Sequence, residues 1–172
     1  MARLSSTSNS VIRCSTGFTL LELMVAIAIL GILLGIGIPS YNAMTESTRL
    51  RSVTHNLTTA AQLARSEAIN RRDTTAVCRA NVGFTACSFA NDWSNGWVVV
   101  EQTGANLQVA ADVDVIRTWD AVDIVVSGAV NGFVFNRSGR ATTTGQLRVQ
   151  NDTDSRCLFV NGSGRVAGAD CP

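Results

Sequence analysis

The chain of 172 residues contains no lysine and a single histidine, and these absences rule out several kinds of functional site. Without lysine, it cannot form the glycine-rich loop with a terminal lysine that holds phosphate groups. His55 lies on a predicted helix with no serine or cysteine beside it to complete a catalytic triad. The aspartates lack the spacing of a calcium loop, and the cysteines lack the paired spacing of a zinc site. The sequence therefore predicts a protein that is not an enzyme and holds no metal or cofactor.

The net charge is also small, at +1 at pH 7, and this balance does not indicate binding to nucleic acid. The length suits about one domain, and 46% hydrophobic residues are enough to bury a core. All 14 basic residues are arginines. Four aspartates bunch together in the middle of the chain: Asp112, Asp114, Asp120 and Asp123. Five arginines lie in the last 36 residues: Arg137, Arg140, Arg148, Arg156 and Arg165.

The five cysteines divide into one before the long apolar segment, Cys14, and four well beyond it. The four are Cys78, Cys87, Cys157 and Cys171, which allow three disulfide pairings. The sequential pairing closes two short loops, which suits an oxidising compartment such as a bacterial periplasm. The alternative is four unrelated buried thiols.

The N-terminal segment from Phe18 to Ile38 is apolar for 21 residues, and Glu22 is its only charged residue. As a helix it would span roughly 30 Å, enough to cross the hydrocarbon core of a bilayer. Arg3 and Arg13 precede it, and no acidic residue does. This charge pattern favours a cytoplasmic N-terminus. We therefore expect a transmembrane segment over 18–38, with the remainder of the chain translocated.

A cleaved secretory signal is the main alternative for this segment, but its apolar run is long and no small-x-small cleavage site ends it. Helical periodicity also continues beyond it, since apolar residues recur at steps of three and four. They are Leu50, Val53, Leu57, Ala60, Ala61, Ala64 and Ala68. The pattern predicts one helix over 18–70 that is first transmembrane and then amphipathic, with a kink at Pro39.

Glu22 needs a partner, because a carboxylate in hydrocarbon is costly. A cut between Gly17 and Phe18 would create a cationic amino group on Phe18, one helical turn away. Pairing within the chain or with a neighbouring chain would neutralise both charges. The alternative is a glutamate that reaches the membrane interface near the end of the helix.

The residues around that cut, Ser15-Thr16-Gly17-Phe18-Thr19-Leu20-Leu21-Glu22-Leu23, resemble the prepilin cleavage site of type IV pilins and type II secretion pseudopilins. The resemblance implies that a prepilin peptidase cuts after Gly17 and methylates the new N-terminus at Phe18. Glu22 matches the acidic residue of that family, and Pro39 matches the proline that kinks its helix.

After residue 70, short β-like runs alternate with Asn, Asp, Gly and Ser, which predicts a mainly antiparallel β domain packed on the helix. The runs are Thr75–Arg79, Gly96–Glu101, Leu107–Ala110, Val113–Thr118, Ile124–Ser127, Gly132–Asn136, Gln146–Gln150, Arg156–Val160 and Arg165–Ala167. Trp93, Gly96 and Trp97 form a W-x-x-G-W segment that leads into a strand. This segment is similar to that of the FimT/FimU and GspH-like minor pilin group, as are Phe135–Arg140 and the late Gly-Arg-Val.

The resemblance implies an α+β pilin fold: a prepilin leader over 1–17, a long helix over 18–70 and a periplasmic β-rich domain over 71–172. It implies a minor type IV pilin that takes part in pilus assembly, with a type II secretion minor pseudopilin as the alternative. The implied partners are other pilin subunits, the prepilin peptidase and the inner membrane of a Gram-negative bacterium. The chain would later enter the pilus or pseudopilus.

DNA is a further candidate partner, because some members of the FimT group are DNA receptors through a C-terminal Gly-Arg-x-Arg element. The matching residues here are Gly164-Arg165-Val166-Ala167, so the second arginine of the element is absent. The candidate DNA-binding residues are Arg137, Arg140, Arg148, Arg156 and Arg165. The alternative is that these arginines keep an extracytoplasmic surface soluble.

Overall fold

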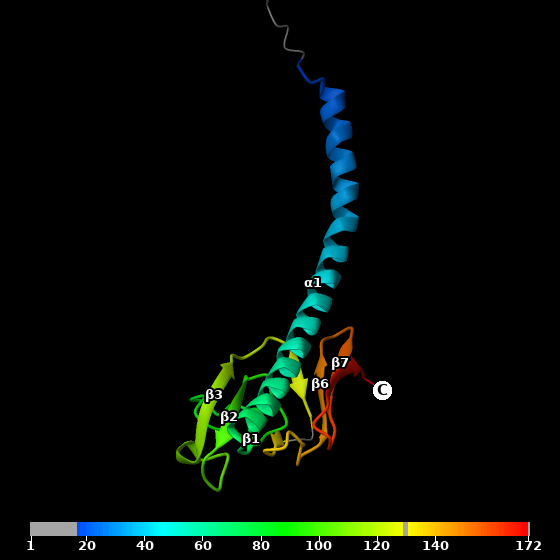
Figure 1. The fold of residues 1–172 in the computed structure, drawn as a ribbon. Helices are drawn as coiled ribbons and strands as arrows, with labels where there is room; N and C mark the ends of the chain where they lie inside the picture. The colour runs from blue at the N-terminus through cyan, green and yellow to red at the C-terminus, as the bar shows by residue number, and fades with distance from the viewer. Residues whose placement is uncertain (1–16, 129–130, 172) are drawn as a thin grey trace, which may run out of the picture. The chain divides into compact units, whose positions relative to one another are not determined.

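The computed structural model describes residues 17–128 and 131–171, so Arg3, Arg13 and Cys14 lie outside the described residues. One helix, α1, runs without a break over Leu20–Arg71, close to the predicted 18–70 (Figure 1). The chain divides into two units after Asn42, and each is described by itself. The helix continues through Pro39. The kink expected at this residue stays a prediction.

The N-terminal unit is the first part of α1, and its large apolar side chains are exposed in every direction around the helix. Within the part of the chain that the structure describes, no helix has the length and apolar character needed to cross a membrane. The transmembrane segment over 18–38 therefore remains a prediction from the sequence.

The second unit consists of the rest of α1 and two four-stranded antiparallel sheets. The first sheet has the order β3-β2-β1-β5, and the second has the order β4-β6-β7-β8. The strands are β1 (Thr75–Arg79), β2 (Trp97–Gln102), β3 (Val113–Trp119), β4 (Val125–Ser127), β5 (Gly132–Phe135), β6 (Gly145–Gln150), β7 (Ser155–Val160) and β8 (Val166–Asp170). The predicted class, α+β with a long N-terminal helix and antiparallel strands, is confirmed.

The main core lies between α1 and the inner faces of both sheets (Figure 1). The helix contributes the periodic residues predicted from the sequence, of which Leu50, Leu57 and Ala64 are at most 1% exposed. Alternate strand residues face them, such as Val77 and Phe133, which lie opposite each other in register. Trp93 and Trp97 are also fully buried in this core.

One predicted strand, Leu107–Ala110, is wrong. The chain there forms a turn and then a short 3-10 helix, η1, over Ala110–Asp112. The side chain of Asn106 accepts a hydrogen bond from the Gln108 amide at 2.9 Å, and the Asp112 carboxylate accepts one from the Asn106 amide at 2.9 Å. These local bonds hold the backbone in turns, although the apolar residues had suggested an extended run.

Candidate functional site

The start of α1 carries an N-cap that explains part of the role of Glu22. Thr19 precedes the helix, and its hydroxyl oxygen accepts a hydrogen bond from the Glu22 amide at 3.2 Å. Glu22 is thus the third helical residue, where a carboxylate is stabilised by the positive end of the helix dipole. This cap was not predicted from the sequence, although the Thr-x-x-Glu spacing is its signal.

The helix beyond this cap exposes a continuous apolar surface that the chain itself leaves uncovered. Phe18 is 83% exposed and Leu20 is 76% exposed. The same holds for the other large apolar residues of this unit: Leu21, Leu23, Met24, Val25, Ile27, Ile29, Leu30, Ile32, Leu33, Leu34, Ile36 and Ile38. In the described residues, Glu22 has no ion pair. A surface of this size and kind marks contact with lipid or with other protein.

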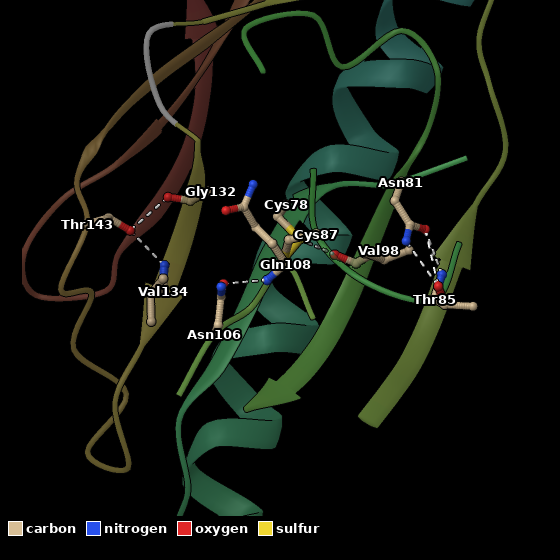
Figure 2. Close-up of a disulfide and its surroundings, with 10 residues drawn as sticks. All are labelled: Cys78, Asn81, Thr85, Cys87, Val98, Asn106, Gln108, Gly132, Val134 and Thr143. Carbon is tan, nitrogen blue, oxygen red and sulfur yellow. Dashed lines mark hydrogen bonds between the residues drawn. A yellow bond between two sulfur atoms is a disulfide. The ribbon is translucent and has the colours of Figure 1, made fainter. Parts of the chain in front are cut away.

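Two disulfides join the four C-terminal cysteines in the sequential pairing, and the first links Cys78 to Cys87 with a Cα–Cα distance of 5.5 Å. Cys78 lies opposite Val98 in the register of β1 and β2, on the outer face of the first sheet. The disulfide holds a tight loop in which the Thr85 amide donates to the Asn81 side chain at 2.9 Å (Figure 2). A second, smaller core forms between this loop and the sheet.

The second disulfide joins Cys157 in β7 to Cys171, just after β8, with a Cα–Cα distance of 5.0 Å. It fastens the end of the described chain to the second sheet. Such covalent links suit a domain that works outside the cytoplasm.

The outer edge of β5 is also covered. The Thr143 hydroxyl donates to the Gly132 carbonyl at 2.8 Å and accepts from the Val134 amide at 2.7 Å (Figure 2). These bonds occupy backbone groups that would otherwise be free to pair with a strand of another chain.

Three of the five candidate arginines are brought together by two turns of the same sequence pattern, Asn-x-Ser-Gly-Arg. One turn covers residues 136–140 after β5, and the other covers residues 161–165 between β7 and β8. In each, the side-chain oxygen of the asparagine accepts a hydrogen bond from the amide of the closing arginine, at 3.1 Å for Arg140 and 3.0 Å for Arg165. We call this pair of turns the arginine knuckle.

The two turns pack directly against each other at their glycines. A Cβ atom on Gly164 would overlap the carbonyl oxygen of Gly139, and both glycines have positive φ, at +77° and +73°. Arg65 of α1 lies beneath them and donates from Nε to the Gly139 carbonyl at 3.0 Å. The knuckle therefore joins the helix to both sheets. The contact of Arg65 with the knuckle was not predicted from the sequence.

The arginines of the knuckle are exposed to solvent. Arg137, Arg140 and Arg165 lie on its surface, and within residues 17–128 and 131–171 none of them has a carboxylate within salt-bridge distance. The other two candidates lie elsewhere. Arg148 is opposite Cys157 in the register of β6 and β7, and Arg156 lies 3.8 Å from the Asp170 carboxylate. The structure thus gathers three of the predicted five.

At the other end of the β domain is an open hollow of about 560 Å³ with an acidic lining. Three carboxylates line it, from Glu46, Asp123 and Asp152, and Arg49 is its one arginine. The Arg49 guanidinium lies 3.7 Å from the Glu46 carboxylate. We call this feature the acidic hollow.

Across the two described stretches, no group of three His, Cys, Asp or Glu side chains is arranged to hold a metal ion. His55 is exposed on α1.

Comparison with known proteins places these features in a family. The family described as type II transport protein GspH matches residues 53–164, which is well over half of the chain. The chain belongs to the GspH family. Residues 12–38 match the prokaryotic N-terminal methylation motif, which includes Gly17, Phe18 and Glu22. No curated protein matches the sequence at a significant level.

Solved structures support the fold of this GspH-family chain. Two crystal forms of the type IV minor pilin FimU from Pseudomonas aeruginosa (strain PAO1) are similar to it. The P65 form is 19% identical in sequence to this chain, with a TM-score of 0.54, and the match covers 70% of this chain and 92% of the FimU chain. The P21 form is 21% identical in sequence, with a TM-score of 0.56, and the match covers 75% of this chain and 92% of the FimU chain. The predicted resemblance to pilins and pseudopilins is confirmed.

Membership of the GspH family also indicates the general role of this chain. Its family consists of structural subunits of pilus-type filaments, and the methylation motif marks a membrane-anchored component of such an assembly. Assembly with other pilin subunits and processing by a prepilin peptidase follow from the same two matches.

Proposed function

We propose that the chain is a minor pilin that enters a type IV pilus through its N-terminal helix, as a subunit that helps to start or cap the filament. The observation that carries this proposal is the N-terminal unit itself, which is apolar on every side and exposed. Such a helix gains its stability by exchanging lipid for the helices of neighbouring subunits. The small residues Gly31 and Gly35 permit close helix approach.

The sequence divides into three functional parts under this proposal. A leader over 1–17 is removed between Gly17 and Phe18, and the new N-terminus at Phe18 is methylated. The segment over 18–38 holds the chain in the inner membrane as a single pass, with the kink at Pro39. The β-rich domain over 71–172 faces the periplasm, a position that the two disulfides support.

Glu22 is the assembly residue in this mechanism. The capped carboxylate lies at the start of an apolar helix, and cleavage creates a cationic amino group at Phe18. In a filament, the carboxylate of one subunit neutralises the amino group of an adjoining subunit. Both charges would otherwise be buried in apolar surroundings, where an unpaired charge costs several kcal/mol, about 3–5 by analogy with broken buried pairs.

The test compares Glu22→Gln with Thr19→Ala in the full chain. Glu22→Gln removes the charge and keeps the shape, whereas Thr19→Ala removes the cap and keeps the charge. We expect Glu22→Gln to lower incorporation into sheared filaments at least about tenfold, while Thr19→Ala has the smaller effect, because a lost cap costs only about 1 kcal/mol. Equal losses would mean that Glu22 acts only in capping. Mass spectrometry of the filament subunit should give methylated Phe18 as the first residue.

The alternative is a minor pseudopilin of type II secretion, which the description of the matched family favours. Deleting the chain distinguishes the two functions. Loss of pili with normal secretion supports the pilus, and the reverse supports secretion.

A second candidate function is DNA capture at the pilus tip. The specific observation in its favour is the set of three exposed arginines of the knuckle, none of which has a carboxylate partner among the residues described. Guanidinium groups bind phosphates without base specificity. A gel shift with the full chain in detergent should show binding that falls steeply with salt and weakens in Arg165→Ala.

A further inference from the structure

The two sheets of the β domain end in the edge strands β3, β5, β4 and β8, and two of these edges are occupied within the chain. The Thr143 side chain binds backbone groups of β5. Along β4, the Trp93 amide donates to the Val126 carbonyl at 2.7 Å, and the Val126 amide donates to the Ser94 hydroxyl at 3.0 Å. Neither edge is therefore free to pair with a strand of another chain.

The β3 edge is protected in a different way. The register of β2 and β3 shifts between Val99 and Val100, as in a β-bulge, and Arg117 lies opposite Val99 on the face turned to the main core. The guanidinium carbon of Arg117 lies 4.9 Å from the centre of the Trp119 ring. A bulge and an inward-facing charge are devices by which natural sheets prevent pairing with other chains.

The edge of β8 has none of these protections. Its five residues pair with β7 in unbroken register, and the first four, Val166–Ala169, carry no charge. Its last three residues are exposed. The disulfide between Cys157 and Cys171 holds the end of the strand against the sheet. β8 is therefore an open edge whose position is fixed.

The hydrogen bonds of the hairpin that joins β7 to β8 show which backbone groups face outward. The Asn161 amide donates to the Arg165 carbonyl at 3.2 Å, so these two residues form a hydrogen-bonded pair. Hydrogen-bonded and non-hydrogen-bonded pairs alternate along antiparallel strands. The N–H and C=O groups of Val166, Gly168 and Asp170 therefore point away from β7. Within the described part of the chain, β8 pairs with no strand other than β7 and makes no further main-chain hydrogen bond.

The direction of β8 relative to α1 follows from the contacts of the second sheet. β7 runs along α1 from the acidic hollow beside Glu46 to the knuckle beside Arg65. β8 returns in the opposite direction, and a Cβ on Gly168 would lie 3.6 Å from the Thr54 side chain. β8 therefore lies along α1 and runs opposite to it.

We propose that the outer edge of β8 accepts an extended strand from a different pilin subunit, which becomes the fifth strand of the second sheet. A row of outward N–H and C=O groups is complementary to an extended backbone. The small side chains of Ala167, Gly168 and Ala169 leave room for bulky apolar side chains on the added strand. The inference rests on the proposed filament role, in which this chain meets other pilin subunits.

A different subunit fits this edge better than a second copy of the chain. Two copies could pair β8 with β8 symmetrically only as antiparallel strands. Since β8 lies along α1, that arrangement would point the two helices in opposite directions, whereas subunits anchored in one membrane point the same way. A subunit that starts or caps a filament also has different subunits as neighbours. Because the other three edges are protected, strand addition at β8 does not propagate through this chain.

The experiment compares Gly168→Pro with Gly168→Ala in the full chain, in cells that assemble the filament. Proline removes the outward N–H, and it is tolerated in an edge strand where that N–H faces away from the sheet. Alanine keeps the N–H, and its Cβ makes only ordinary contacts, the closest at 3.6 Å. We expect Gly168→Pro to lower incorporation into sheared filaments about tenfold relative to Gly168→Ala, because a backbone bond to the partner is lost. The two variants should have similar unfolding midpoints.

A second matched pair, Asp170→Pro and Asp170→Ala, repeats the comparison at another outward N–H. It keeps the test decisive if Gly168→Pro does not fold. Both changes at this position remove the contact of Asp170 with Arg156, so the difference between them isolates the backbone N–H. Asp170→Pro should again incorporate less than its alanine control.

A photo-crosslinker then identifies the occupant. Benzoylphenylalanine replaces Ala169, which is exposed on β8. After irradiation of the cells, the adduct should have the mass of this chain joined to a different subunit that carries the N-terminal methylation motif. The same adduct should be lost in the Gly168→Pro background and kept in the Gly168→Ala background.

Three results would overturn the inference: equal incorporation of the proline and alanine variants, no adduct at position 169, or an adduct with a second copy or with a protein outside the pilin class. If the proline variants enter filaments normally and Glu22→Gln does not, the proposed function stands and strand addition fails. If the adduct depends on the Gly168 amide and Glu22→Gln incorporates normally, the helix mechanism fails and strand addition stands. An adduct with a pseudopilin would keep strand addition and assign the chain to secretion.

Discussion

The contact between the two turns of the knuckle predicts a large difference between two glycines only two residues apart. Gly164 has a φ of +77°, and a Cβ there would overlap the backbone carbonyl of Gly139. Gly162, in the same turn, has no such φ, and the nearest atom to a Cβ would be 4.0 Å away. The substitutions Gly164→Ala and Gly162→Ala therefore add the same methyl group in two different surroundings.

The magnitude follows from two costs at Gly164. The left-handed backbone costs an L-residue about 1–2 kcal/mol. Overpacking against a neighbour that cannot move costs about 1–3 kcal/mol, and here the neighbour is backbone rather than a flexible side chain. We expect Gly164→Ala to lower the free energy of unfolding by about 2–5 kcal/mol and Gly162→Ala to change it by less than about 1 kcal/mol. Gly139→Ala should be intermediate, because the atom it meets first is the end of the Ile69 side chain.

Denaturant unfolding followed by tryptophan fluorescence measures these values, since Trp93 and Trp97 are fully buried in the core that the knuckle closes. The midpoint should shift without a change in slope if the unfolding remains two-state. The reasoning would be refuted if Gly162→Ala were as destabilising as Gly164→Ala. That result would mean that the two turns are not in contact.

Local patterns allowed much of the fold to be predicted from the sequence. Leu50, Leu57 and Ala64 recur at helical spacing, and they are buried because one face of α1 packs on the sheets. The strand bounds were close for the same reason, since turn residues end each apolar run. Leu107–Ala110 failed because Asn106 and Asp112 bind nearby amides, a side-chain effect that hydrophobicity does not record.

The gathering of charges was harder to predict, because it depends on which strands pair. The two Asn-x-Ser-Gly-Arg turns are visible in the sequence, yet only the strand topology places Gly139 against Gly164. Arg156 was predicted with the other arginines, but register sets it opposite Asp170 at the edge of the second sheet. The arginines of the knuckle can be identified in the sequence, but which of them lie close together depends on how the strands are arranged in the two sheets.

Two further predictions concern covalent and electrostatic links. Replacing Cys78 and Cys87 together with alanine should lower the free energy of unfolding by about 2–4 kcal/mol, which denaturant titration can measure, because the loop they close covers the smaller core. The pKa of Asp92 is lowered chiefly by the hydrogen bond that its carboxylate accepts from the Ser94 amide at 2.9 Å, with the Ser94 side chain adding to the effect. Because the folded-state pKa lies below the unfolded one, the carboxylate stabilises the fold above the unfolded pKa of about 3.9, and this contribution is lost as the pH falls through the folded-state value. Asp92→Asn keeps an oxygen that accepts the bond and removes only the charge, so it should be slightly less stable than the unmodified chain at pH 7 and equal to it near pH 2. A difference that stayed constant from pH 7 to pH 2 would show that the charge of Asp92 contributes nothing to this turn.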